Sequence, residues 1–196
     1  MDKKDIFEVA EKNNGYVCAK QIKEQGIPSS YLSRLVKENK LERVYKGVYI
    51  TPETFEDPEY IYSLRYPNII YSGESAMFLN LLSCKQYVNM VEVTVPYGTT
   101  VPKIEGAKVI VSRKKNIDLG VTIVNTCFGN PVKCYDKERT ICDLFMRPDN
   151  FDSEDRVYAI KEYNQYYLNR AKLYEYAKQL GVYSEVKNVY EVLVWN

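Results

Sequence analysis

The chain has 196 residues, of which 45% are hydrophobic and 27% charged, and its formal net charge is +1. This composition is typical of a globular protein, and it excludes a disordered chain and one that is basic along its whole length. The sequence has no long apolar run and no apolar segment behind its charged N-terminus. We therefore expect a cytoplasmic protein without a membrane span or a secretory signal.

Two features of the residue composition limit the kinds of catalytic site, metal site and disulfide that the chain could have. The sequence contains no histidine, which excludes Ser-His and Cys-His nucleophile pairs and imidazole metal ligands. No C-x-x-C pair occurs, which argues against a disulfide framework or a zinc ribbon and favours buried free thiols. We predict no metal site and no cofactor. The five cysteines are Cys18, Cys84, Cys127, Cys134 and Cys142.

The first fifty residues have the pattern of a helix-turn-helix. Apolar residues at helical spacing predict three short helices, and the third has an exposed face rich in Ser, Tyr, Arg and Lys. Gly26 and Pro28 form the turn before this third helix, and Ser29 is its expected N-cap. The expected helices cover residues 2–13, 19–25 and 30–38, with an extended segment at 16–18.

A hairpin is expected directly after the third helix. Residues 41–45 and 47–50 alternate and contain β-branched and aromatic side chains, with Lys46 and Gly47 at the reversal. A hairpin at this place is the wing of a winged helix-turn-helix. The expected fold is thus α+β, with an N-terminal winged helix-turn-helix followed by a mixed α/β domain and a helical tail.

The third helix and the hairpin carry the candidate DNA contacts. Residues 1–50 hold ten Lys and Arg against seven Asp and Glu, whereas residues 51–196 have a net charge of −2. Cations on a helix and a hairpin can neutralise phosphates, although the solvated face of a protein-binding domain would carry similar charges. The candidate DNA-binding residues are Ser29, Ser30, Tyr31, Ser33, Arg34, Lys37, Lys40, Arg43, Tyr45 and Lys46.

Residues 51–58 contain two prolines and three acids, which indicates a linker between a first domain, residues 1–50, and a second, residues 59–196. In the second domain two helical patterns precede four strand patterns, and four further helical patterns follow. The expected strands are 92–97, 107–112, 120–125 and 132–135, and the expected helices are 59–66, 73–82, 137–146, 153–167, 169–180 and 184–195.

The second domain shows no catalytic motif. Its E-x-K sequence, Glu185 to Lys187, lies on a predicted helix, no predicted strand carries D-x-D, and the phosphate-binding glycine patterns are missing. Glu138, Arg139 and Asp143 form the most suggestive polar cluster, but the last two have the spacing of a structural ion pair on a helix. We predict a binding module rather than an enzyme, with no catalytic residues.

Tyrosines interleave with lysines and arginines in the expected helical tail. Such a pattern can stack the bases of single-stranded nucleic acid. The helical spacing of Tyr163 with Tyr167, and of Tyr183 with Tyr190, favours packing instead.

Five stretches of the sequence occur in an order and spacing that recur in one known family. They are Gly15 to Val17, Gly26 to Ser29, Leu41 to Tyr49, Ser72 to Ala76, and the helix entry Lys137 to Asp143. Together they resemble the AbiEi family, the antitoxins of type IV toxin–antitoxin systems linked to phage abortive infection.

The resemblance implies an antitoxin that represses its own operon by binding inverted repeats in double-stranded promoter DNA. It also implies a nucleotidyltransferase toxin as partner, neutralised largely through the C-terminal domain and without a stable complex. Three other functions remain open on the residues alone: a ligand-sensing transcriptional regulator, a divergent nuclease, and a protein-interaction adaptor that binds no nucleic acid.

Overall fold

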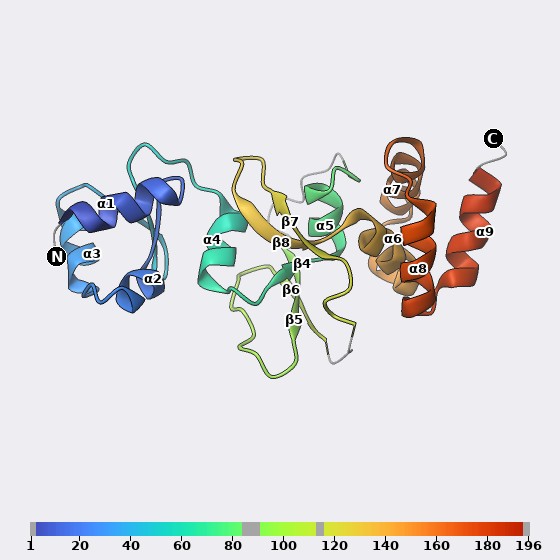
Figure 1. Ribbon diagram of the computed structural model, residues 1–196, viewed down its shortest axis with the longest axis horizontal. Helices are drawn as coiled ribbons and strands as arrows, with labels where there is room; N and C mark the ends of the chain where they lie inside the picture. Colours follow the sequence, from blue (N-terminus) through green and yellow to red (C-terminus); the bar gives the residue numbers. More distant parts are fainter. Residues whose placement is uncertain (1–2, 84–90, 113–115, 194–196) are drawn as a thin grey trace. The chain divides into compact units, whose positions relative to one another are not determined.

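The computed structural model describes residues 3–83, 91–112 and 116–193 (Figure 1). Contacts divide the chain into two units, Met1–Pro67 with Phe128–Asn130, and Asn68–Cys127 with Pro131–Asn196. Helices and two sheets are both present, so the expected mixture of α and β structure is confirmed. None of the helices in these described ranges is long and apolar enough to cross a bilayer.

The first unit contains short helices and a three-stranded antiparallel sheet, coloured blue to cyan in Figure 1. The strand order is β1-β3-β2, so the hairpin of β2 and β3 is extended by the strand that precedes α2. The helices and the hairpin expected in residues 1–50 are thereby confirmed. The elements are α1 (Lys3–Lys12), β1 (Tyr16–Cys18), α2 (Ala19–Glu24), α3 (Ser30–Lys37), β2 (Glu42–Tyr45), β3 (Val48–Ile50) and α4 (Pro58–Arg65).

One apolar core holds α1, α2 and α3 together. Leu32 and Leu35 of α3 are completely buried against Ile22 of α2 and its neighbours. Burying one side chain of this size typically stabilises a fold by about 1.5–3 kcal/mol. The core fixes which face of α3 points inward, and the opposite face is left to solvent. Its members are Ile6, Ala10, Val17, Ile22, Ile27, Leu32, Leu35 and Leu41.

The expected capping of α3 by Ser29 is wrong. This residue already has helical dihedral angles, φ −62° and ψ −19°, and its side chain makes no capping hydrogen bond. Backbone carbonyls serve the first amides instead, because Tyr31 donates to the Pro28 oxygen and Leu32 to the Ser29 oxygen, each at 3.1 Å. The Ser29 side chain therefore remains exposed.

Residues 51–58, expected as a linker, pack within the first unit. The Tyr16 hydroxyl donates to the Phe55 carbonyl at 2.7 Å. Asp57 is fully buried, caps α4 by accepting from the Tyr60 amide at 3.2 Å, and accepts from Asn130 Nδ2 at 2.7 Å. The structural division therefore differs from the expected domains 1–50 and 59–196, because these contacts join residues far apart in sequence and place α4 in the first unit.

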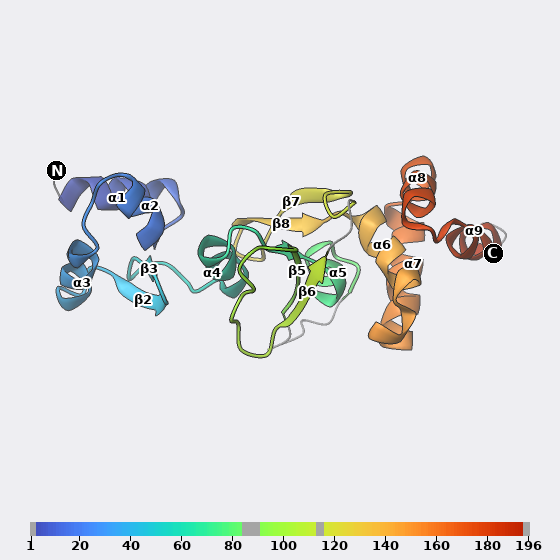
Figure 2. The same cartoon turned by 90° about the horizontal axis from the view of Figure 1, so that it is seen from below.

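The second unit is built on a five-stranded mixed sheet with the order β6-β5-β4-β8-β7 (Figure 2). Its central strand, β4 (Ile70–Tyr71), is parallel to β8 and antiparallel to β5. Sequence analysis missed β4, because two residues are too few to show an alternating pattern. The four strands that it expected are present: β5 (Glu92–Pro96), β6 (Lys108–Ser112), β7 (Val121–Asn125) and β8 (Pro131–Tyr135).

Helices complete the second unit. The helix α5 packs on the sheet, and α6 contacts each of the three helices that follow it (Figures 1 and 2). These helices match the expected ranges to within a few residues. They are α5 (Gly73–Leu79), α6 (Lys137–Met146), α7 (Ser153–Tyr166), α8 (Arg170–Leu180) and α9 (Tyr183–Leu193). The structure adds a 3₁₀ turn that was not expected, η1 (Pro148–Asn150).

The tyrosines of α7 to α9 divide into buried and exposed members. Tyr163 and Tyr190 are completely buried, and their rings meet edge to face at 6.0 Å. The packing expected for these two is confirmed. Tyr158 and Tyr166 are exposed, so sequence spacing alone did not separate core tyrosines from surface ones.

Three of the described cysteines are the buried free thiols that were expected, namely Cys18, Cys134 and Cys142. Burial raises the pKa of the Cys142 thiol to about 12. Cys127 contradicts the expectation because it is exposed, just beyond the end of β7. Cys84 lies outside the described residues.

Candidate functional site

The exposed face of α3 carries the polar residues that were expected to contact DNA. Because Leu32 and Leu35 face the core, residues spaced three, four and seven apart line the opposite side of the helix. All four candidate contacts on this side are exposed. They are Ser30, Ser33, Arg34 and Lys37.

Arg34 is held by its own helix on two sides. Its Cζ lies 4.6 Å from the centre of the Tyr31 ring, which is one turn earlier. Its Nε lies 3.8 Å from Glu38 Oε1, one turn later, and half of its side chain is exposed (50%). An exposed ion pair of this kind contributes little to stability, but together the ring and the carboxylate place a neighbour on each side of the guanidinium.

Glu38 also holds a second candidate cation. Lys40 Nζ lies 2.9 Å from Glu38 Oε2, just after Asn39, whose left-handed φ of +53° follows the end of α3. One carboxylate thus lies between Arg34 and Lys40. Sequence analysis did not single out Glu38, although its i, i+4 spacing from Arg34 is the signal that would have indicated it.

The hairpin adds two exposed cations. Arg43 lies on β2 opposite Tyr49 of β3, and Lys46 lies at the reversal beside Gly47, whose φ is +83°. A positive φ costs glycine little, so the strands reverse tightly at this position. The hairpin therefore presents cations at and near its tip.

Tyr45, another candidate contact, is turned toward α4. It is half-buried, and its ring meets that of Tyr62 edge to face at 5.6 Å. Burial and the neighbouring Tyr66 raise the pKa of Tyr45 to about 12. The structure thus does not group Tyr45 with the exposed cations of α3 and the hairpin.

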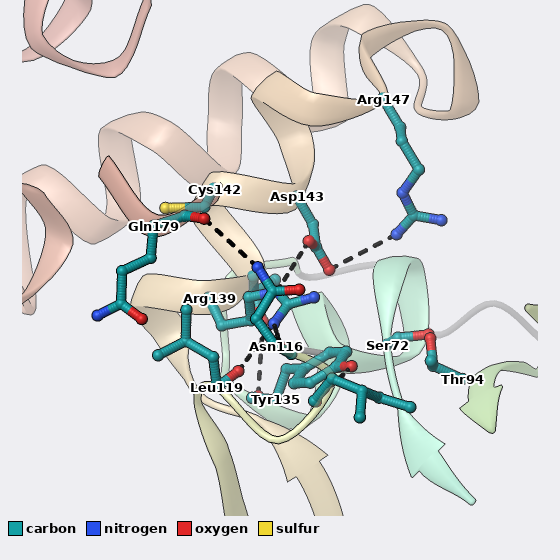
Figure 3. A network of polar contacts seen from close by, with 12 residues as sticks. Ser72, Thr94, Asn116, Leu119, Tyr135, Arg139, Cys142, Asp143, Arg147 and Gln179 are labelled. Carbon is teal, nitrogen blue, oxygen red and sulfur yellow. Dashed lines mark hydrogen bonds and ion pairs between the residues drawn. The ribbon is translucent and has the colours of Figure 1, made fainter. Parts of the chain in front are cut away.

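In the second unit, Arg139 and Asp143 of α6 form the ion pair that their spacing predicts (Figure 3). Arg139 Nε lies 3.0 Å from Asp143 Oδ1, and both side chains are more than nine-tenths buried. Arg139 Nη1 also donates to the carbonyls of Asn116 and Leu119, at 3.0 and 2.9 Å. Its guanidinium lies over the Tyr135 ring at 4.2 Å. These bonds fasten α6 to the loop before β7.

Arg147 continues this network to the sheet. Its guanidinium contacts Asp143 at 3.5 Å and Glu92 of β5 at 3.3 Å, and Lys108 of β6 contacts Glu92 at 3.4 Å. Burial raises the pKa of the Asp143 carboxyl, and the guanidiniums of Arg139 and Arg147 oppose part of that rise. Within the part of the chain that the structure describes, no group of three metal-ligating side chains could hold an ion.

A comparison with protein families concerns the first of these two sites, the exposed surface of α3 and the hairpin. Residues 4–52 match a family model described as "Transcriptional regulator, AbiEi antitoxin". The N-terminal segment belongs to the AbiEi family. This AbiEi segment contains all ten candidate DNA contacts, from Ser29 to Lys46, together with the Glu38 carboxylate.

A solved structure resembles a larger part of the chain. The crystal structure of the RV2827C protein from Mycobacterium tuberculosis is similar with a TM-score of 0.60, over 88% of this chain and 69% of that one. The two sequences are 14% identical, so this likeness shows a common fold alone. No curated protein matches the sequence.

Proposed function

We propose that this chain is the antitoxin and autorepressor of a type IV toxin–antitoxin operon and acts in the cytoplasm. The observation that carries the proposal is the exposed cationic surface of α3 and the hairpin, formed by Arg34, Lys37, Arg43 and Lys46, within an AbiEi antitoxin regulator segment. We call these four residues the basic surface.

For DNA, α2 and α3 with the hairpin act as a winged helix-turn-helix. The exposed face of α3 enters the major groove, and the hairpin lies along the flanking phosphates as the wing. The targets are inverted repeats in double-stranded promoter DNA, as the AbiEi resemblance implies. Two copies of the chain related by a two-fold axis would read the two half-sites of such a repeat.

For antitoxicity, the second unit counters a nucleotidyltransferase toxin by binding and without turnover. The buried polar side chains of α6 support this assignment, because Arg139 and Asp143 are already bonded to each other and to the fold. These bonds give both groups a structural role, so we assign them no catalytic one. As the AbiEi resemblance implies, no stable complex with the toxin is required.

A paired assay in one host tests this division of labour. Promoter-reporter repression and survival on toxin induction are measured for the full chain and for Arg34→Ala/Lys37→Ala. We expect repression to fall at least tenfold and survival to stay near the wild-type level. The charge-matched control is Arg170→Ala/Lys178→Ala, which removes two exposed cations from the second unit and should leave repression intact. Loss of both functions in the folded α3 variant would show that antitoxicity acts through DNA binding.

One observation favours a second function, a regulator that senses a ligand. A groove of about 420 Å³ on the second unit is lined by apolar side chains, including Phe145, Ile160 and Val189, with Arg156, Lys161 and Glu185 beside them. Because its two cations outnumber the one acid, such a surface suits a small carboxylate with an apolar body. A thermal-shift screen of such acids tests it, and a hit must also relieve repression in the reporter assay.

A further inference from the structure

We infer that Arg34 is the base-reading residue of α3 and recognises guanine, with Tyr31 and Glu38 as positioning residues. This inference rests on the proposed binding of promoter DNA. It adds which residue supplies sequence specificity, which base it recognises, and what holds it ready.

The geometry around Arg34 leaves one edge of its guanidinium available. Tyr31 covers a face of the planar group, and Glu38 contacts its Nε. Apart from Glu38, no residue in the described ranges forms a hydrogen bond or ion pair with the Arg34 side chain. The edge that carries Nη1 and Nη2 is therefore a fork of two N–H donors on the exposed face of α3.

A fork of this kind matches one base edge in the major groove. Guanine presents two neighbouring acceptors, O6 and N7, and a guanidinium can donate to both at once. Adenine presents N7 next to the N6 amino donor, so one arm of the fork would meet a donor. An arginine whose plane is already set loses less conformational freedom on binding and discriminates more sharply.

The other three cations of the basic surface have no neighbouring side chains that hold them in this way. The side chains of Lys37, Arg43 and Lys46 make no hydrogen bond or ion pair with residues in the described stretches. Their charges are exposed and unrestrained, which suits contacts to phosphates that carry no sequence information. Glu38 is itself anchored by Lys40 at 2.9 Å, so the acid that orients Arg34 is partly neutralised next to DNA.

The experiment uses the full chain and randomised duplexes. Selection with the wild-type protein gives its preferred site, and each guanine of that site is then replaced by adenine, one base pair at a time. We expect one replacement per half-site to weaken wild-type binding about 5- to 150-fold, the range of a bidentate arginine–guanine contact. Arg34→Lys keeps the charge without the fork and should lower that discrimination to about twofold or less.

Two further substitutions test the positioning residues. Tyr31→Leu and Glu38→Gln should reduce the discrimination between guanine and adenine, whereas Tyr31→Phe, which keeps an aromatic face, should retain it. Lys37→Ala is the control and should weaken binding to both duplexes by the same factor. Circular dichroism and thermal unfolding establish that each variant is folded.

The outcomes are distinguishable. Unchanged guanine preference in folded Arg34→Lys overturns the inference and leaves the proposed function standing, since Arg34 would then contact phosphate. A wild-type chain that binds no duplex at low salt overturns the proposed function and, with it, this inference. Loss of guanine preference in Arg34→Lys alongside full preference in Lys37→Ala supports both.

Discussion

Arg139 and Asp143 lie one turn apart on α6, with Nε and Oδ1 separated by 3.0 Å and both side chains nearly closed to water. Helical geometry alone brings the two groups together. What makes their burial tolerable is the second set of bonds, from Arg139 to the carbonyls of Asn116 and Leu119, because an incompletely bonded charge in a protein interior is costly.

We therefore expect Arg139→Met to destabilise the second unit by about 3–5 kcal/mol, the usual cost of removing one partner of a buried pair. The substitution leaves Asp143 without its closest cation and leaves two carbonyls without a donor. Urea unfolding followed by circular dichroism measures the loss. The double variant Arg139→Met/Asp143→Leu should recover part of it, because it also removes the stranded carboxylate.

A matched pair on α9 provides the control for that measurement. Lys187 and Glu191 have the same i, i+4 spacing at 3.5 Å, but their side chains are 42% and 55% exposed. Lys187→Ala should cost about 1 kcal/mol or less. Equal losses in the two pairs would contradict the structural role assigned to Arg139.

Gly120 is expected to resist substitution more than Gly181. Both have left-handed φ, +79° and +77°, but a Cβ on Gly120 would lie 2.5 Å from Arg139 Cβ, whereas one on Gly181 would meet nothing within 4 Å. Gly181→Ala should cost about 1–2 kcal/mol from its backbone conformation. Gly120→Ala should cost about 1–3 kcal/mol more from overpacking. Thermal unfolding compares the two variants, and equal melting temperatures would count against this account.

The two hairpin cations, Arg43 and Lys46, are expected to bind DNA without regard to its sequence. Arg43→Ala and Lys46→Ala should each lower affinity by a similar factor for operator and random duplexes. Each should also reduce the slope of log affinity against log salt by about one. Fluorescence anisotropy at several salt concentrations measures both quantities, and an altered operator preference at constant slope would refute the assignment.

We expect the ionisation of Tyr16 to lower the free energy of unfolding at alkaline pH. Burial, with the nearby Asp57 charge, raises the pKa of Tyr16 from 10.0 to about 12. The protonated Tyr16 hydroxyl makes its full contribution to the free energy of unfolding below pH 10. That contribution is lost as the pH rises toward 12, because Tyr16 releases its proton at a lower pH in the unfolded chain than in the folded one. Between pH 9 and 11 the wild type should lose about 1 kcal/mol more than Tyr16→Phe. Urea unfolding measures this free energy at each pH, and equal losses in the wild type and in Tyr16→Phe would contradict the prediction.

Thiol labelling separates the exposed cysteine from the buried ones. In Cys84→Ser, which removes the cysteine outside the described residues, a disulfide reagent at pH 8 should label Cys127 at once. Labelling of Cys18, Cys134 and Cys142 should wait for unfolding, because their thiols are buried. Adding Cys127→Ser should abolish the fast phase, and a remaining fast phase would show that a buried thiol is accessible.

Local pattern was sufficient for most individual elements. The helical spacing of Leu32 and Leu35 predicted both the helix and its buried face, and alternation predicted the hairpin of β2 and β3, because these signals repeat within a few residues. The Arg139–Asp143 pair was predictable for the same reason. The family resemblance carried by the first fifty residues was likewise visible in sequence alone.

Tertiary contacts decided what lies between distant residues. The burial of Asp57 and its bond from Asn130, 73 positions away, brought residues 51–58 into the first unit. The two-residue strand β4 exists because its neighbours supply partners on both sides. The guanidinium of Arg34, finally, is oriented by a ring and a carboxylate whose side-chain positions follow from the packed helix. The spacing in the sequence places such groups on one face of the helix. The packing of their side chains determines which of their atoms remain available to a ligand.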